Sequence, residues 1–183
     1  MSNIDLTHSA IQFSVRHMMF AKVRGKFDHW SAELTLDPND LTRSRVDAVI
    51  ETASIDTGVA DRDKHLRSSD FFDAAKYPEI HFKSTAVEKA ESGYRITGAL
   101  TIRDVTRPVT LELEALGGGR DPWGQQRLGF SARGAINRKD FGLSWNQALE
   151  TGGVLVGEEI KIEVDAQVVV SEASDTEQQV AAG

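Results

Sequence analysis

The sequence contains no cysteine, so disulfide bonds and thiolate metal sites play no part in its chemistry. Basic residues are also outnumbered, because 21 lysines and arginines stand against 28 aspartates and glutamates, for a net charge of −7. No lysine and arginine cluster appears along the chain, and a nucleic-acid partner needs such a basic face. No stretch approaches the roughly 20 apolar residues of a membrane-spanning helix. Neither nucleic-acid binding nor a transmembrane segment is therefore expected.

The N-terminus lacks the basic and apolar regions of a secretory signal peptide. Because the chain starts at Met1, we expect a cytoplasmic protein rather than one from which a signal has been removed. The length suits a single all-β domain, which we place at residues 1–171. Residues 172–183 are small and polar, and we expect them to form a disordered tail.

Catalytic motifs are missing as well. The chain has no G-x-S-x-G elbow, no P-loop and no dinucleotide fingerprint. Its five histidines are scattered, and none has the H-x-x-x-H spacing of paired metal ligands. We therefore expect a protein that is not an enzyme, with no metal and no cofactor.

What the sequence does contain is a repeated alternation of apolar and polar residues, which is typical of half-buried strands. Closing a sheet of such strands buries every apolar face and removes exposed edges. The pattern predicts an all-β fold, an eight-stranded antiparallel up-and-down barrel with short helical inserts. One long strand changes phase near Asp28 and His29, which indicates a β-bulge. The predicted strands are residues 11–17, 23–36, 46–50, 80–84, 94–102, 109–115, 128–136 and 160–170.

Four segments interrupt this pattern. Residues 59–67 favour a helix, and Ser69 could cap a second short helix at residues 70–76. Gly117, Gly118 and Gly119, together with Pro122 and Gly124, are typical of a flexible hairpin loop. Residues 137–153 form another insert without strand character.

The inward face of the predicted barrel carries the first candidate binding residues. Its bulky members could fill an ordinary core, or they could line a cavity, because small residues on the same faces leave space. The bulky candidates are Phe13, Val15, Phe27, Trp30, Phe82, Leu100 and Phe130. The small inward residues are Gly25, Ala32, Ala48, Ser84, Gly98, Ala132, Gly134 and Ala166, of which Ala132 and Gly134 are included as binding candidates.

Further candidates lie where strands end. Met19 and Phe20 follow the first strand and could either plug the barrel or touch a ligand, since methionine suits variable apolar shapes. His17 is either a core histidine or a polar group at the cavity mouth. Phe71 and Phe72 could anchor a helix to the rim and line the entrance. The second insert adds Phe141 and Trp145.

Several short motifs in a fixed order resemble one known family. The sequence between residues 54 and 84 carries most of them, and coverage extends over roughly residues 4 to 170. The motifs are Phe13-Ser14-Val15-x-His17, Ser54-Ile55-Asp56-Thr57, Arg62-Asp63-x-His65-Leu66, Asp70-Phe71-Phe72-Asp73, Pro78-x-Ile80-x-Phe82-x-Ser84, Val105-Thr106-Arg107-Pro108 and Asn137-Arg138-x-Asp140-Phe141-Gly142. Taken together they are similar to the YceI-like family.

The resemblance implies a lipocalin-like barrel that binds a polyisoprenoid or a similar long-chain lipid in its interior. It also implies a homodimer, which the apolar run Val168-Val169-Val170 supports weakly. Two alternatives stay open. One is a barrel enzyme for a hydrophobic substrate with Asp63 and His65 as acid and base, and the other is a packed scaffold without a ligand.

Overall fold

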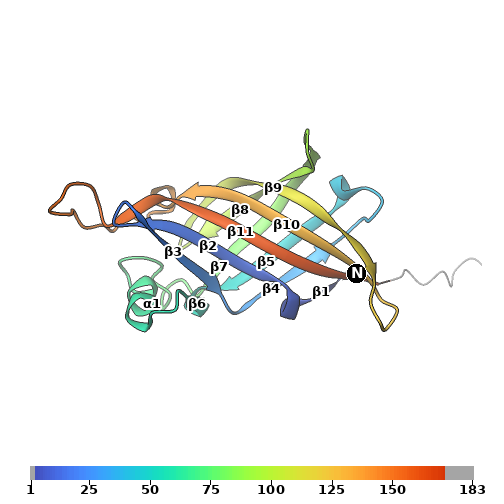
Figure 1. Ribbon diagram of the computed structural model, residues 1–183, viewed down its shortest axis with the longest axis horizontal. Coiled ribbons are helices and arrows are strands. Elements are labelled where there is room, and N and C mark those ends of the chain that lie inside the picture. Colours follow the sequence, from blue (N-terminus) through green and yellow to red (C-terminus); the bar gives the residue numbers. More distant parts are fainter. Residues whose placement is uncertain (1–2, 172–183) are drawn as a thin grey trace, which may run out of the picture.

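The computed structural model describes residues 3–171, so the predicted tail at 172–183 lies outside the described part of the chain. The fold is all-β, as predicted, and its strands form one curled antiparallel sheet (Figure 1). The strands are β1 (Asn3–Ile4), β2 (Ala10–His17), β3 (Ala21–Phe27), β4 (Trp30–Thr35), β5 (Arg45–Glu51), β6 (Ile55–Asp56), β7 (Glu79–Lys89), β8 (Tyr94–Ile102), β9 (Val105–Arg120), β10 (Gln126–Asn137) and β11 (Val156–Val170).

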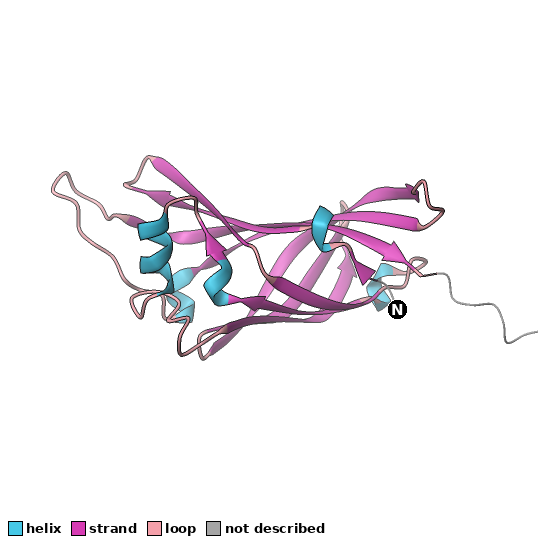
Figure 2. Ribbon diagram, turned by 90° about the horizontal axis from the view of Figure 1, so that it is seen from below, coloured by secondary structure: helices cyan, strands magenta, loops and turns pink. Residues whose placement is uncertain are grey.

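Short helices fill some of the connections. One α-helix, α1 (Ala60–Arg67), lies between β6 and β7 and covers one end of the sheet, as Figure 2 shows. The 3-10 turns are η1 (Leu6–His8), η2 (Leu41–Arg43), η3 (Thr52–Ser54) and η4 (Arg138–Phe141). We call the two ends of the barrel the α1 end and the β1 end (Figure 1).

The strand order is that of an up-and-down meander. It runs β4-β5-β7-β8-β9-β10-β11-β2-β3-β6, and every pair is antiparallel. The count of eleven exceeds the eight predicted because the long strand predicted at residues 23–36 is divided into β3 and β4, and the short strands β1 and β6 add two more.

The predicted β-bulge near Asp28 and His29 is instead a break that divides the long strand into β3 and β4. Backbone hydrogen bonds carry the pairing across the break, from Asp28 N to Ser54 O at 3.1 Å and from Glu51 N to His29 O at 2.9 Å. β3 therefore pairs with β2 and β6, while β4 pairs with β5. The chain passes directly from β3, near one end of this strand order, to β4 at the other end. The sheet therefore closes on itself around its apolar face.

Two local predictions need correction. The predicted hairpin loop is confined to residues 121–125, because Gly118 and Gly119 continue β9 and pair with Leu128 and Arg127 of β10. A side chain at position 118 would collide with the Arg127 carbonyl oxygen, 2.3 Å from an added Cβ, so glycine is required by close approach of the strands.

Residues 70–76 form turns and not a helix. The amide nitrogens of Phe72, Asp73 and Ala74 donate back to carbonyl oxygens at the C-terminal end of α1. Asp73 has a φ of 48°, in the left-handed region, which stops a helix from propagating. This segment therefore wraps the end of α1 and holds it against the barrel.

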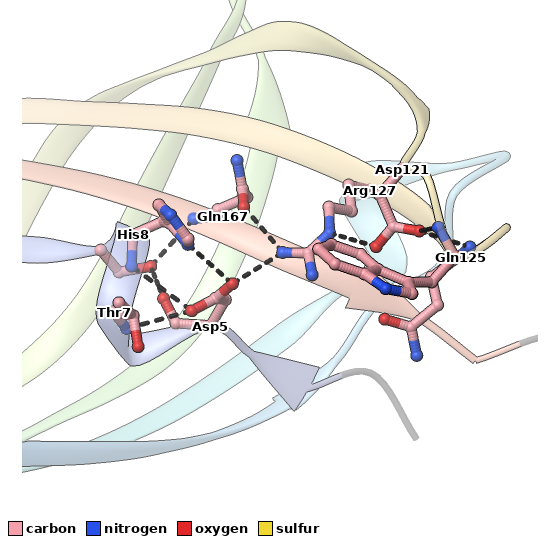
Figure 3. Close-up of polar contacts among 9 residues, drawn as sticks. Asp5, Thr7, His8, Asp121, Gln125, Arg127 and Gln167 are labelled. Atoms are coloured by element: carbon pink, nitrogen blue, oxygen red, sulfur yellow. Dashed lines mark hydrogen bonds and ion pairs between the residues drawn. The ribbon is translucent and has the colours of Figure 1, made fainter.

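A charge cluster fastens the N-terminal segment at the β1 end. Figure 3 shows the guanidinium of Arg127 between Asp5 and Asp121, with contacts of 2.6 and 2.8 Å. Hydrogen bonds from His8 and then from Arg127 hold the pKa of Asp5 well below its ordinary value of 3.8. The pKa of Asp121 is lowered mainly by its bond to Arg127. The cluster ties the segment after β1 to β10 through ionised carboxylates.

Candidate functional site

A cavity of about 320 Å³ runs along the interior of the barrel. Inward side chains from nearly every strand line it, from Ile4 and Leu41 at the β1 end to Leu66 and Leu143 at the α1 end. All but four of its lining residues are apolar. Such a bore offers dispersion and desolvation to a ligand and very few hydrogen bonds.

The four polar lining residues are Gln12, Ser44, Arg45 and Arg138. Arg138 is buried, and its guanidinium donates to the carbonyl oxygens of Leu143 at 2.6 Å, Trp145 at 2.9 Å and Gly157 at 2.8 Å. Burial lowers the pKa of Arg138 from its ordinary value, but an arginine stays charged in a protein. Arg138 therefore holds the loop after η4 against β11.

Arg45 and Ser44 lie at the opposite end of the cavity. Arg45 donates to the carbonyl oxygens of Thr42 and Ser44, and the Ser44 hydroxyl accepts from the backbone of Asp37. No aspartate, glutamate or histidine lines the cavity formed by residues 3–171. The bore thus carries no acid–base pair.

Ten of the predicted binding residues lie in the lining of this cavity. Eight of them come from strands that are distant in sequence, and the inward phase of the alternation brings these together. The other two, Phe71 and Phe72, belong to the turn segment after α1. They are Phe13, Val15, Phe27, Trp30, Phe71, Phe72, Phe82, Leu100, Phe130 and Ala132.

Aromatic rings connect the α1 insert to the bore. Phe13 and Phe27 lie with ring centroids 5.7 Å apart, and Phe72 meets Phe27 edge-on at 6.1 Å. Phe71 is buried instead against His65 and Trp145, at 5.1 and 5.3 Å. One ring of the pair therefore anchors the insert while the other reaches the middle of the cavity wall.

The expected role of the small inward glycines needs correction. A Cβ added at Gly134 would lie 2.5 Å from the Leu111 side chain, so Leu111 already occupies that space. In the same way Phe13 lies over Gly25, and Phe82 lies over Gly98. Gly134 is not a cavity residue, because a neighbouring side chain covers it. The alanines at 32, 48 and 166 do line the bore.

Three candidates at the end of β2 also lie outside the cavity. His17 is half-buried in register with Ala21 and Val156. Met19 and Phe20 belong to the β2–β3 turn, where they are exposed to 57% and 81%. Alternation along a strand says which face a side chain occupies, but it does not extend into a turn that reverses the chain.

Phe141 and Trp145 close the α1 end instead of lining it. Phe141 is 2% exposed and belongs to the buried core with Leu143. Trp145 packs edge-on against His65, with centroids 4.6 Å apart. Neither is in contact with the cavity surface, and both fix the insert to the barrel.

The charged residues of α1 act on the neighbouring loop. Asp63 is buried and accepts from the backbone and the hydroxyl of Thr57, at 2.9 and 2.6 Å. Arg62 donates to the hydroxyl and carbonyl of the same Thr57. His65 instead bonds Asp70 at 2.8 Å. Asp63 and His65 thus have separate partners, and neither lines the cavity.

Sequence reasoning missed several lining residues. Leu66 is one of two apolar residues in α1, so its position on a polar helix was the signal that it faces the bore. Leu34 and Leu36 continue the alternation of β4 and could have been included on the same grounds as Trp30. Nothing in the local sequence distinguishes Arg138 as a buried residue.

Residues 3–171 lack two further features. Those residues contain no group of three or more metal-binding side chains. None of their helices is long and apolar enough to cross a membrane.

Comparisons with known proteins agree with this geometry. A family model described as a YceI-like domain matches residues 3–168. A UPF0312 protein of Staphylococcus epidermidis is 43% identical over 166 residues, which cover 90% of this chain and 95% of that protein. The crystal structure of Burkholderia cenocepacia BcnA is similar with a TM-score of 0.78 and 25% identity, over 90% of this chain and 99% of that one.

A second similar structure is a polyisoprenoid-binding domain from Saccharophagus degradans that is implicated in plant cell wall breakdown. Its TM-score is 0.65 at 14% identity, over 93% of this chain and 98% of that one. At that identity the likeness shows a shared fold.

Proposed function

Because this chain belongs to the YceI-like family, we propose that it binds one long-chain polyisoprenoid or similar amphiphilic lipid inside the barrel. The observation that carries the proposal is the cavity, whose wall is apolar along almost its whole length. The binding that the Saccharophagus degradans domain is named for supports the ligand class. The protein would act by sequestering the lipid from water, in storage or in transport.

The capacity of the cavity sets a scale for the ligand. Benzene fits a cavity of about 150 Å³, or about 25 Å³ per carbon. The 320 Å³ here then hold about 13 carbon atoms. At about 0.8 kcal/mol for each buried methylene, such a segment contributes about 10 kcal/mol before the cost of association. A longer lipid would extend beyond the bore or displace lining side chains.

The charge distribution of the cavity wall supports a ligand whose bound tail is uncharged. A buried charge is costly without a partner, and the two lining arginines are held by backbone carbonyl oxygens. The proposal assigns no catalytic role to Asp63 or His65, because they bond separate partners away from the cavity.

One part of the proposal is independent of the cavity. We also propose a homodimer, with Val169 beside β1 as part of a half-buried apolar strand end. Light scattering coupled to size exclusion tests this, and the mass of a single chain across a wide concentration range would refute it.

Mass spectrometry of an organic extract of the purified protein tests the binding function. We expect a long-chain isoprenoid or fatty lipid at close to one molecule per chain. The delipidated protein should then take up a fluorescent long-chain lipid with saturable, single-site binding. An extract without lipid, together with no uptake by the delipidated protein, would identify a ligand-free scaffold instead.

A further inference from the structure

The β2–β3 hairpin presents an apolar tip to solvent. Its turn residues Met18, Met19 and Phe20 are exposed to 39%, 57% and 81%. Met18 and Met19 have φ angles of 53° and 69°, in the left-handed region where hairpin turns ordinarily place asparagine or glycine. Large apolar side chains at such positions gain nothing from the fold, since they cover no part of the core.

The neighbouring loop extends this tip. Met18 N donates to Leu155 O at 2.8 Å, and the Met19 side chain lies against Gly153. Val154 between them is 37% exposed. The exposed side chains of Met18, Met19, Phe20 and Val154 therefore form one apolar surface, which we call the hairpin tip. Figure 1 shows the β2–β3 hairpin at the α1 end of the barrel.

Basic side chains stand directly behind the hairpin tip. Arg16 and Lys22 are cross-strand partners, and Arg24 faces Ser14 two positions further along. Ser14 also pairs with Lys161 of β11. All four basic residues are exposed, and within residues 3–171 none of them forms an ion pair. Like charges opposite each other destabilise a sheet, so an anionic partner would relieve this arrangement.

This basic face corrects the expectation from composition. The chain has a net charge of −7, and its basic residues look scattered in sequence. Alternation, however, places those of β2, β3 and β11 on one outer face, where Lys22, Arg24 and Lys161 line a groove of about 580 Å³. Two acidic residues, Asp56 and Glu163, also line this groove, and Glu163 forms an ion pair with Arg133 at 3.3 Å. Glu158 and Glu159 lie in the same part of β11, and Glu158 pairs with Lys139 at 2.7 Å.

The opposite end of the barrel provides a contrast. Trp123 is as exposed as Phe20, at 81%, and Leu116 is exposed to 59%. The guanidinium of Arg127 at that end is already neutralised by Asp5 and Asp121. At the α1 end the exposed apolar side chains therefore adjoin basic side chains that form no ion pair within residues 3–171, whereas Arg127 at the β1 end is paired.

We propose that the β2–β3 hairpin docks the protein on the surface of a bilayer that contains anionic lipids. The hairpin tip enters the boundary between headgroups and acyl chains, and Arg16, Lys22 and Arg24 contact the lipid phosphates. A nucleic acid would satisfy the basic face but would leave the aliphatic side chains of the tip in water. Docking places the end of the cavity that is lined by Val15 and Val156 close to the bilayer, which is the source of the lipid ligand.

Co-sedimentation of the full chain with vesicles tests the proposal. We expect binding to vesicles of equal parts phosphatidylcholine and phosphatidylglycerol, much weaker binding to phosphatidylcholine alone, and weakening by added salt. The triple variant Arg16→Gln, Lys22→Gln, Arg24→Gln should bind the mixed vesicles about a hundredfold more weakly. The double variant Met19→Ser, Phe20→Ser should lose at least tenfold.

Matched controls separate docking from general charge and hydrophobicity. The triple variant Lys83→Gln, Lys89→Gln, Arg95→Gln changes net charge equally on other strands, and Trp123→Ser removes an equally exposed apolar side chain at the β1 end. Both controls should bind vesicles like the wild type.

Three results would overturn the proposal: no sedimentation of the wild type with the mixed vesicles, equal losses in the controls, or binding to a single-stranded oligonucleotide but not to vesicles. Uptake of a fluorescent lipid delivered in solution is measured separately, so loss of docking is distinguishable from loss of cavity binding.

Discussion

Filling the cavity from its alanine side is the sharpest test of lipid binding. Ala32 and Ala48 are cross-strand partners in β4 and β5, and both line the bore. Replacing both by leucine adds six carbon atoms, or about 150 Å³ at about 25 Å³ each. That is close to half of the 320 Å³ available. The capacity should then fall from about 13 to about 7 carbon atoms.

The assay is the affinity of the delipidated protein for linear fatty acids of increasing length. Each further methylene should strengthen binding by about 0.8 kcal/mol until the bore is full. For the double variant this increase should stop about six carbons earlier than for the wild type. For a long fatty acid, the double variant should then lose at most about 5 kcal/mol of binding free energy. If the fatty acid shifts toward one end of the bore, its Kd should still rise at least tenfold.

Stability supplies the second readout for the same variant. Leucines that enter a real cavity should leave the melting temperature unchanged or raise it. Leucines forced into a packed core should cost about 1–3 kcal/mol. Ala135→Leu on the outer face of β10 is the control, because Ala135 is exposed. A destabilised double variant with an unchanged chain-length profile would refute the existence of the bore.

Three further predictions concern the insert and the N-terminal cluster. Phe72→Ser should speed release of a bound fluorescent lipid, because Phe72 reaches Phe27 in the cavity wall, and an unchanged off-rate in stopped-flow would remove this ring from the site. Asp63→Asn should lower the free energy of unfolding by about 1–3 kcal/mol, because it weakens the hydrogen bonds to Thr57. Lipid affinity should stay the same, and a lost affinity with intact stability would contradict the structural role of Asp63. The pKa of Asp5 is lowered in the folded state, so its contribution to stability is complete above its ordinary pKa of 3.8 and is lost as pH falls below it. In acid denaturation, the free energy of unfolding of Asp5→Asn should therefore fall less over that pH range than that of the wild type. An identical fall in the two proteins would refute the linkage.

The class of fold was predictable because alternation is a property of each strand alone. Every predicted strand is present, and the phase change near Asp28 and His29 marks the division of β3 from β4. The loop at residues 117–119 was not predictable in this way, since glycine is typical of loops and of close strand contacts alike. Only the position of Arg127 on β10 shows which of these applies.

The candidate site was predictable to the extent that it depends on strand faces. Residues in the middle of strands, such as Phe13 and Phe130, lie where alternation places them. Met19 and Phe20 do not, because a turn sets their direction. The basic outer face escaped notice for a related reason, since Arg16, Lys22 and Lys161 meet only through the pairing of β2 with β3 and β11.

The position of free space in the barrel depends on which way each ring leans, and a sequence does not contain that information. Phe82 pairs with Ala48 on one side and with Leu100 on the other. Its ring lies over Gly98, within 2.6 Å of where a Cβ would be, and so it leans toward β8 and away from Ala48. Gly98 thus keeps the bore open beside Ala48 by making room for the Phe82 ring, although the space over Gly98 itself is filled. A small inward residue creates a cavity only where no neighbouring side chain covers it, as at Ala32 and Ala48.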